Sequence, residues 1–209
     1  MGHIILLGDS IFDNGVYVPG EPDVVKQLRS ALPAGWSASL LAVDGAVTRS
    51  VAAQVARIPN DATHLVVSAG GNDALGESHI LGAGARMVGE AVMMLAEAQE
   101  RFARNYAEML GSVLGLGLPT ALCTIYDTPS SAPNHRMIRT ALSLFNDVIT
   151  RSAFGHGLPL VDLRLICGDD ADYANPIEPS SRGGEKIARA LAGLLAGDRE
   201  ERRSVVAAL

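Results

Sequence analysis

The residues best suited to chemistry lie near the start of the chain, where a serine follows a short apolar run. Residues 3–7 read His-Ile-Ile-Leu-Leu, and Gly8-Asp9-Ser10 comes directly after them. An apolar run of this length that ends at a glycine predicts a buried parallel strand. A serine in the tight turn after such a strand presents its hydroxyl beside backbone N–H groups, which favours a serine nucleophile with an oxyanion site. The simpler alternative is that Asp9 and Ser10 cap the next helix.

Two further turns could supply hydrogen-bond donors to an oxyanion. Gly45 follows the segment 36–43, which alternates weakly, and a glycine there lets the backbone N–H approach a ligand. Residues 64–69 predict another buried strand, which is soon followed by Asn72 and Asp73. A neutral amide can bind a developing oxyanion without titrating, and such a donor contributes ~10²–10³ in rate. Each turn alone is ordinary, but two of them at consecutive strand ends favour a shared site.

These motifs resemble those of the GDSL, or SGNH, hydrolases, a family of serine esterases, lipases and carbohydrate deacetylases. Gly8-Asp9-Ser10 is similar to the first block of that family, Gly45 to the glycine of its second block, and Gly70-Gly71-Asn72-Asp73 to its third block. The resemblance implies that Ser10 is the nucleophile and that Ser10, Gly45 and Asn72 form the oxyanion hole. It also implies supporting roles for Asp9 and Asp73.

The last block departs from the family pattern. In the family, Asp-x-x-His-Pro precedes the final helix, and the histidine is the base. Here residues 175–179 read Asn-Pro-Ile-Glu-Pro, which puts Glu178 at the histidine position and Asn175 at the aspartate position. The glycines at 183 and 184 and the amphipathic segment 185–195 agree with the pattern.

Three interpretations of this replacement are open. In the first, Glu178 is the base, which requires burial to raise its pKa from ~4.3 towards neutrality, while a neutral Asn175 avoids a second adjacent anion. In the second, a histidine elsewhere is the base: His135 follows the fourth predicted strand on the correct edge of the sheet, whereas His156 lies at the opposite edge. In the third, the chain is a catalytically impaired protein that binds or senses a ligand. We place a serine hydrolase that works through an acyl-enzyme first.

The elements that must position these residues alternate between short apolar strands and amphipathic helices. Strands are predicted at residues 3–7, 36–43, 64–69, 119–124 and 159–162, and helices at 24–32, 46–58, 86–116 (with a break near 96–100), 136–152 and 185–195. This alternation predicts an α/β fold with a parallel sheet. The resemblance implies a three-layer, flavodoxin-like sheet of order 2-1-3-4-5 with helices on both faces. We expect a single domain over residues 1–209, with residues 198–209 as a possible tail.

Composition excludes several classes of function. The chain has 209 residues, is 48% hydrophobic and carries a formal net charge of -6, which favours one globular domain and disfavours nucleic-acid binding. No segment approaches the ~20 apolar residues of a membrane span. The first apolar run is too short for a signal peptide, so we expect a cytoplasmic protein. Cys123 and Cys167 suggest neither a disulfide framework nor a metal cluster, and we predict no metal and no cofactor.

The substrate is predicted to be a small-molecule ester with a short acyl group such as acetyl. This prediction depends on the aromatic content of only 4% and on the lack of a long apolar lid or lipid-binding segment. Phe12, Tyr17 and Tyr126 are the candidate walls of the pocket. The glycine-rich segment 76–84 is predicted to be a loop or lid.

Overall fold

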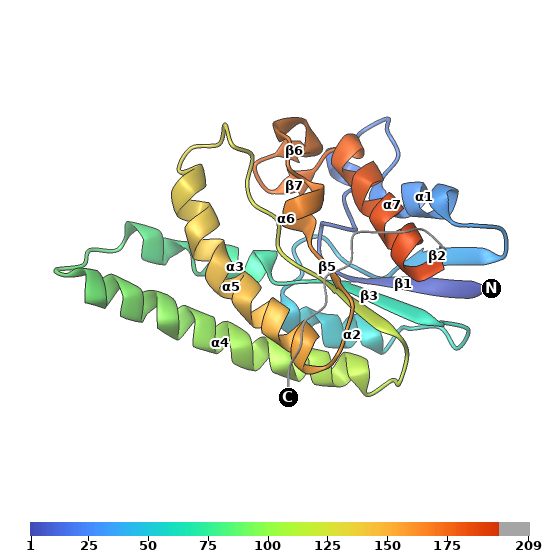
Figure 1. Cartoon of the computed structure of the whole chain (residues 1–209), viewed down its shortest axis with the longest axis horizontal. Helices are drawn as coiled ribbons and strands as arrows, with labels where there is room; N and C mark the ends of the chain where they lie inside the picture. Colours follow the sequence, from blue (N-terminus) through green and yellow to red (C-terminus); the bar gives the residue numbers. More distant parts are fainter. Residues whose placement is uncertain (197–209) are drawn as a thin grey trace.

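The computed structural model describes residues 1–196, which are built on a five-stranded sheet (Figure 1). The strands are β1 (Gly2–Gly8), β2 (Trp36–Leu40), β3 (His64–Ser68), β4 (Thr120–Cys123) and β5 (Leu160–Val161). Their order is β2-β1-β3-β4-β5, and every neighbouring pair is parallel. The predicted fold class and strand order are therefore confirmed. The predicted tail at 198–209 lies outside the described residues.

Helices cover both faces of the sheet, as expected for this fold (Figure 1). One face carries α1 (Val24–Ala31), α6 (Leu163–Ile166) and α7 (Ser181–Ala196), and the other carries α2 (Val51–Val55), α4 (Val88–Leu114) and α5 (His135–Gly155). The alternation of side chains along β1 explains why both faces are apolar: Ile4 and Leu6 pack with α1 and α7, whereas Ile5 and Leu7 pack with α4 and α5. All four side chains are fully buried.

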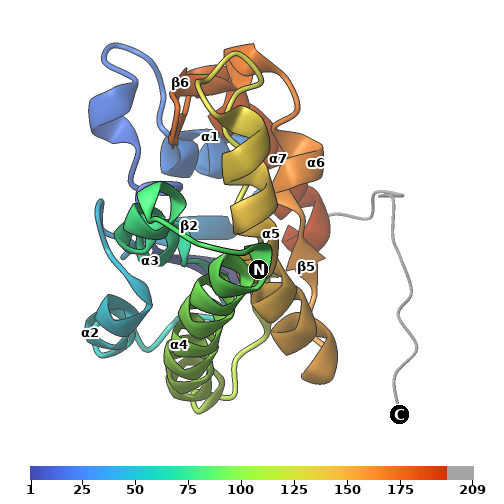
Figure 2. The same cartoon turned by 90° about the vertical axis from the view of Figure 1, so that its left-hand side faces the viewer.

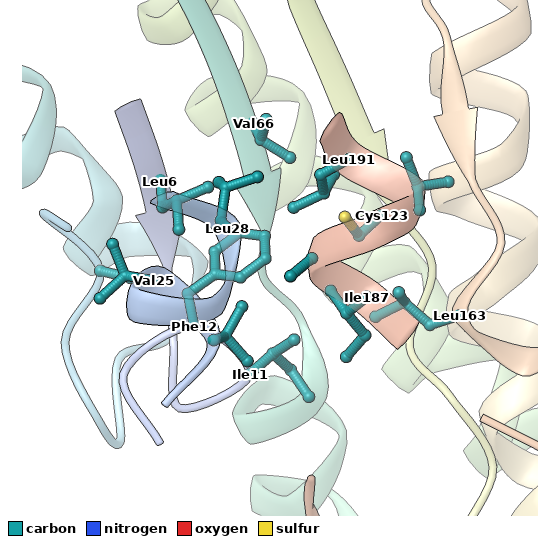
Figure 3. Packing of buried hydrophobic residues seen from close by; sticks show 14 of the residues in the cluster. Leu6, Ile11, Phe12, Val25, Leu28, Val66, Cys123, Leu163, Ile187 and Leu191 are labelled. Atoms are coloured by element: carbon teal, nitrogen blue, oxygen red, sulfur yellow. The ribbon is translucent and has the colours of Figure 1, made fainter. Parts of the chain in front are cut away.

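Phe12 belongs to the first of these cores and not to a substrate pocket. Phe12 is 0% exposed, and it belongs to the buried cluster that also contains Leu6 from β1 and Leu28 from α1 (Figure 3). The turn after β1 directs this side chain to the face of the sheet that α1 and α7 cover. Burial of the aromatic ring there stabilises the fold more than its exposure in a cavity would. The prediction that Phe12 forms a pocket wall is wrong for this reason.

Several element boundaries differ from those predicted. The helix expected at 46–58 is reduced to a 3-10 turn, η2 (Thr48–Ser50), followed by α2, and α4 runs through the break expected near 96–100. Strong helix formers fill that part of α4, which explains its continuity. The segment 76–84, expected to be a loop or lid, begins at the last residue of α3 (Gly71–Gly76) and contains the 3-10 helix η3 (Ser78–Gly82).

A small antiparallel hairpin that sequence patterns did not predict precedes α7. It pairs β6 (Tyr173–Asn175) with β7 (Glu178–Pro179), and it follows a 3-10 turn, η4 (Asp170–Asp172). Gly183 lets α7 approach this segment, because a Cβ atom at residue 183 would lie 2.1 Å from the carbonyl oxygen of Asp172. Within residues 1–196, no helix combines the length and the apolar character that crossing a membrane requires.

Candidate active site

Ser10 lies in a turn that β1 and β3 hold together. Gly8 has a φ of +123°, and a Cβ there would lie 1.7 Å from the carbonyl oxygen of Ser68, so that only glycine fits. The Asp9 N–H donates to that same Ser68 oxygen at 3.1 Å, and the Phe12 N–H closes the turn on the Asp9 carbonyl oxygen. Among the described residues, the Ser10 N–H has no hydrogen-bond acceptor. The turn therefore leaves both the hydroxyl and the N–H of Ser10 available to a ligand.

The Ser10 hydroxyl meets the carboxyl group of Glu178. Its Oγ donates to Glu178 Oε1 at 3.0 Å, although the two residues are 168 positions apart. The exposed fractions of Ser10 and Glu178 are only 6% and 4%. Burial raises the pKa of Glu178 to about 7, with a smaller contribution from the charge of Asp44 and against the opposing hydrogen bond from Ser10. Near neutral pH this group is therefore present both as a base and as an acid.

The hairpin places Glu178, and Tyr126 holds the hairpin. Asn175 Oδ1 accepts a hydrogen bond from the Ile177 N–H at 2.9 Å, so that the Asn175 side chain shapes the turn rather than orienting the Glu178 carboxyl group. The Tyr126 hydroxyl donates to the Ile177 carbonyl oxygen at 2.9 Å, and its ring packs edge-on against Tyr173. These contacts hold the backbone of the hairpin beside Glu178, and Asn175 does not act on its carboxyl group as the third member of a triad would.

Asn14 is a second anchor of Glu178, and sequence analysis missed it. This side chain is fully buried; its Nδ2 donates to the Pro179 carbonyl oxygen at 3.2 Å, and its Oδ1 accepts from the Val24 N–H at 3.0 Å. It therefore joins the Ser10 loop, the first turn of α1 and strand β7. The chain offers only a weak signal for this role, because an asparagine in a polar loop usually caps a turn.

The second and third motifs are joined by hydrogen bonds. Asn72, near the start of α3, donates from Nδ2 to the Ala46 carbonyl oxygen at 3.0 Å. Asp73 accepts from both the N–H and the hydroxyl of Thr48, at 2.9 and 2.8 Å. Gly45, which directly precedes Ala46, has a φ of +76°, and its N–H has no acceptor among the described residues. The Asn72 and Asp73 contacts therefore hold the Gly45 turn against α3.

Asp9 is a second buried carboxyl group near Ser10. It is 2% exposed, and its Oδ1 accepts a hydrogen bond from the Ile11 N–H at 3.2 Å. Burial raises the pKa of Asp9 to about 7, and the nearby charges of Glu178 and Asp73 add to this effect against the Ile11 hydrogen bond. Close to neutral pH the site thus carries less negative charge than it would if Asp9 and Glu178 were both fully ionised.

A cavity of about 300 Å³ opens beside these groups. Asp9, Ser10, Asn72 and Glu178 line one part of it, together with Tyr126 as predicted. Its other walls come from α3, η3 and the amino-terminal halves of α4 and α5. Figure 2 shows the side of the molecule where α3, α4 and α5 lie. Gly45 is not part of the lining. The structure therefore brings Ser10, Asn72 and Glu178 to one cavity, with the Gly45 turn attached through Ala46.

Three predicted candidates lie away from the cavity walls. Tyr17, in the 3-10 turn η1 (Gly15–Tyr17), donates to Asp44 Oδ2 at 2.8 Å, a contact that raises the pKa of Tyr17 to about 12. His135 begins α5, and its Nδ1 lies 2.8 Å from the Thr128 carbonyl oxygen, outside the lining. His156 follows the carboxyl end of α5, and a helix of this length separates it from His135 by about 30 Å. Within residues 1–196, neither histidine lines the cavity or forms a hydrogen bond with Ser10.

The described part of the chain also contains no group of three or more His, Cys, Asp and Glu side chains arranged to hold a metal ion. Cys123 and Cys167 are free and buried in the core.

Comparison with known proteins gives consistent matches. A family model, the GDSL-like lipase/acylhydrolase family, matches residues 6–185. Among solved structures, the chain is similar to a lipase from a goat rumen metagenome (21% identity, TM-score 0.72, covering 95% of this chain and 99% of that one). It is also similar to phospholipase A1 from Streptomyces albidoflavus NA297 (17%, 0.67, 92% and 98%) and to an acetyl xylan esterase (14%, 0.70, 92% and 99%). A search of curated proteins gives no match.

Proposed function

Because this chain belongs to the GDSL-like lipase/acylhydrolase family, we propose that it hydrolyses carboxylic esters, with Ser10 as nucleophile and Glu178 as base. The observation that carries the proposal is the 3.0 Å hydrogen bond from Ser10 Oγ to Glu178 Oε1 beside the cavity. A general base has to lie within about 2.6–3.2 Å of the proton that it removes, with a pKa near the working pH. Glu178 meets both conditions.

In the proposed acylation step, Ser10 Oγ attacks the carbonyl carbon of the ester while its proton moves to Glu178. The negative charge of Glu178 thereby passes to the carbonyl oxygen, and the net charge of the site does not change. A histidine base would instead create an ion pair. Glu178 then gives the proton to the departing alkoxide, and the acyl group stays on Ser10. A water molecule then attacks the acyl carbonyl carbon while its proton moves to Glu178. The bond from that carbon to Ser10 Oγ breaks, Glu178 returns the proton to Oγ, and the acid leaves.

The carbonyl oxygen requires donors when it becomes an anion. The backbone N–H groups of Ser10 and Gly45 have no acceptor among the described residues, and the Asn72 amide has a second hydrogen besides the one given to Ala46. We assign the oxyanion hole to these three groups. A raised pKa at Asp9 assists, because a protonated neighbour does not repel the oxyanion.

The predicted preference for a short acyl group depends on composition alone. The apolar cavity beside Ser10 argues for a longer chain. We place the alcohol part of the ester outside the cavity lining, near Tyr17 and the Gly45 turn.

The decisive experiment labels Ser10. Wild-type protein should react with a fluorophosphonate probe and hydrolyse p-nitrophenyl esters, and Ser10→Ala should abolish both. Ser112→Ala, an exposed serine on α4, is the matched control and should behave like wild type. If wild-type Ser10 remains unlabelled while a ligand stabilises the protein against heat, the result would support the alternative of a ligand-binding protein without turnover.

A further inference from the structure

The cavity beside Ser10 is lined mainly by hydrocarbon. Beyond the polar groups around Ser10, its walls consist mostly of aliphatic and aromatic side chains from η3, α4 and α5. They include Ile80, Leu81, Leu95, Ile138, Leu142 and Phe145. Among the described residues no lysine, arginine or histidine contributes to the lining, which disfavours an anionic ligand. The carboxyl groups of Glu77 and Asp127 are each paired with an arginine.

The size of the cavity limits what it can hold. Its volume of about 300 Å³ is roughly twice that of the ~150 Å³ apolar cavity that holds one benzene ring. By this measure it accommodates about a dozen carbon atoms, and somewhat fewer once its open mouth is allowed for. An acetyl group would fill only a small part of it and leave the remaining apolar wall in contact with water.

We propose that this cavity binds the acyl chain of the substrate and selects an unbranched chain of about six to ten carbons. The inference rests on the proposed ester hydrolysis at Ser10, because the chain is placed by its attachment to the carbonyl carbon that Ser10 attacks. A sugar or a charged group would need several hydrogen-bonding partners along its length, and the η3, α4 and α5 walls offer mainly aliphatic carbon. The prediction of a short acyl group depended on aromatic content, which does not describe this wall because aliphatic side chains form most of it.

Ala141 is a specificity-determining residue in this inference. It lies on α5 within the lining, on the same helix face as Ile138 and Phe145, and its small side chain leaves room in the cavity. A phenylalanine at 141 would occupy that room without a new charge or a new hydrogen bond. Thr140, the preceding residue, is exposed and lies outside the lining, so Thr140→Phe is a matched control for the added ring.

The test is kcat/KM for p-nitrophenyl acetate, butyrate, octanoate and dodecanoate. Each methylene that the cavity buries can raise kcat/KM by up to ~4-fold, and burial of about three of the extra methylenes of octanoate would give up to ~60-fold. We therefore expect octanoate to exceed acetate by at least ~30-fold and dodecanoate to fall below octanoate. Ala141→Phe should reduce kcat/KM for octanoate by at least ~10-fold while changing that for acetate by less than ~2-fold. Thr140→Phe should retain the wild-type profile.

Two results would overturn the inference while the esterase function stands: a maximum at acetate or butyrate, or identical chain-length profiles for Ala141→Phe and Thr140→Phe. Failure of the esterase function has a different signature, namely that no ester is cleaved and Ser10 is not labelled. In that event octanamide and acetamide test the cavity directly on Ser10→Ala. The inference requires that octanamide alone raises the melting temperature and that Ala141→Phe removes this effect.

Discussion

Replacing Glu178 by glutamine should abolish activity and at the same time stabilise the fold. Glutamine has nearly the same shape and can still accept the hydrogen bond from Ser10 Oγ, but it cannot take up the proton. Loss of the base in serine hydrolases costs ~10⁴-fold or more in rate, and we expect a loss of that order in kcat/KM. The wild-type kcat/KM should rise with pH through about 7, as Glu178 becomes ionised.

The effect on stability follows from the same pKa. The folded protein raises the pKa of Glu178 from 4.5 to about 7, so that between these values the folded state binds more protons than the unfolded state. The ionised carboxylate therefore destabilises the fold above pH 7, and this cost disappears as the pH falls from 7 towards 4.5. At full ionisation the difference amounts to about 3 kcal/mol at most. The corresponding increase in melting temperature for a chain of this size is on the order of 6–12 °C.

The assay compares wild type with Glu178→Gln by denaturant unfolding at pH 8.5 and pH 5. Glu178→Gln should be more stable at pH 8.5, and the difference should shrink at pH 5. Glu185→Gln, which removes an exposed carboxylate on α7, should stay within about 1 kcal/mol of wild type at both pH values.

Glu178→Gln tests the role of Glu178 as base separately from its raised pKa. Full activity in Glu178→Gln would show that the base lies elsewhere. Lost activity without a gain in stability at pH 8.5 would show that burial does not raise the pKa of Glu178. If the glutamate is instead an inactivating replacement, Glu178→His combined with Asn175→Asp should exceed the wild-type kcat/KM.

Two further predictions concern the framework of the site, and a third concerns metal ions. Asn14→Ala leaves the Val24 N–H and the Pro179 carbonyl oxygen unpaired. It should therefore lower the free energy of unfolding, measured in urea, by about 2–4 kcal/mol, and it should lower kcat more than it raises KM. An unchanged kcat would contradict the anchoring role of Asn14. Gly183→Ala should lower the free energy of unfolding by more than about 2 kcal/mol, because its new Cβ would clash with the Asp172 carbonyl oxygen. Gly111→Ala is the control: it lies on α4 with open space around it, so it should leave the free energy of unfolding unchanged or raise it by about 0.5–1 kcal/mol. Dialysis against EDTA should leave esterase activity unchanged, because every step proposed for Ser10 uses side chains and water alone.

The sequence alone determined the positions of the strands and the turns that follow them. Apolar runs such as residues 3–7 and turn residues such as Gly8 act locally, because side-chain periodicity and backbone conformation depend on near neighbours. The same local signals placed Ser10 and Asn72 after the ends of two strands, whereas the order that makes these strands neighbours came from the family resemblance. Element lengths were less certain: strong helix formers carried α4 through an expected break, and the hairpin of β6 and β7 has too few residues to show a period.

Only the tertiary structure decided which side chains meet and in what environment. Glu178 and Ser10 are far apart in the chain, and no local pattern reports the 3.0 Å contact between them or the burial that raises the pKa of Glu178. The aromatic residues show the same limit: Phe12 packs in the core, whereas Tyr126 lines the cavity and holds the hairpin. The direction of a single side chain depends on the space left by elements distant in the sequence, and the volume of the cavity depends on how η3, α4 and α5 pack together.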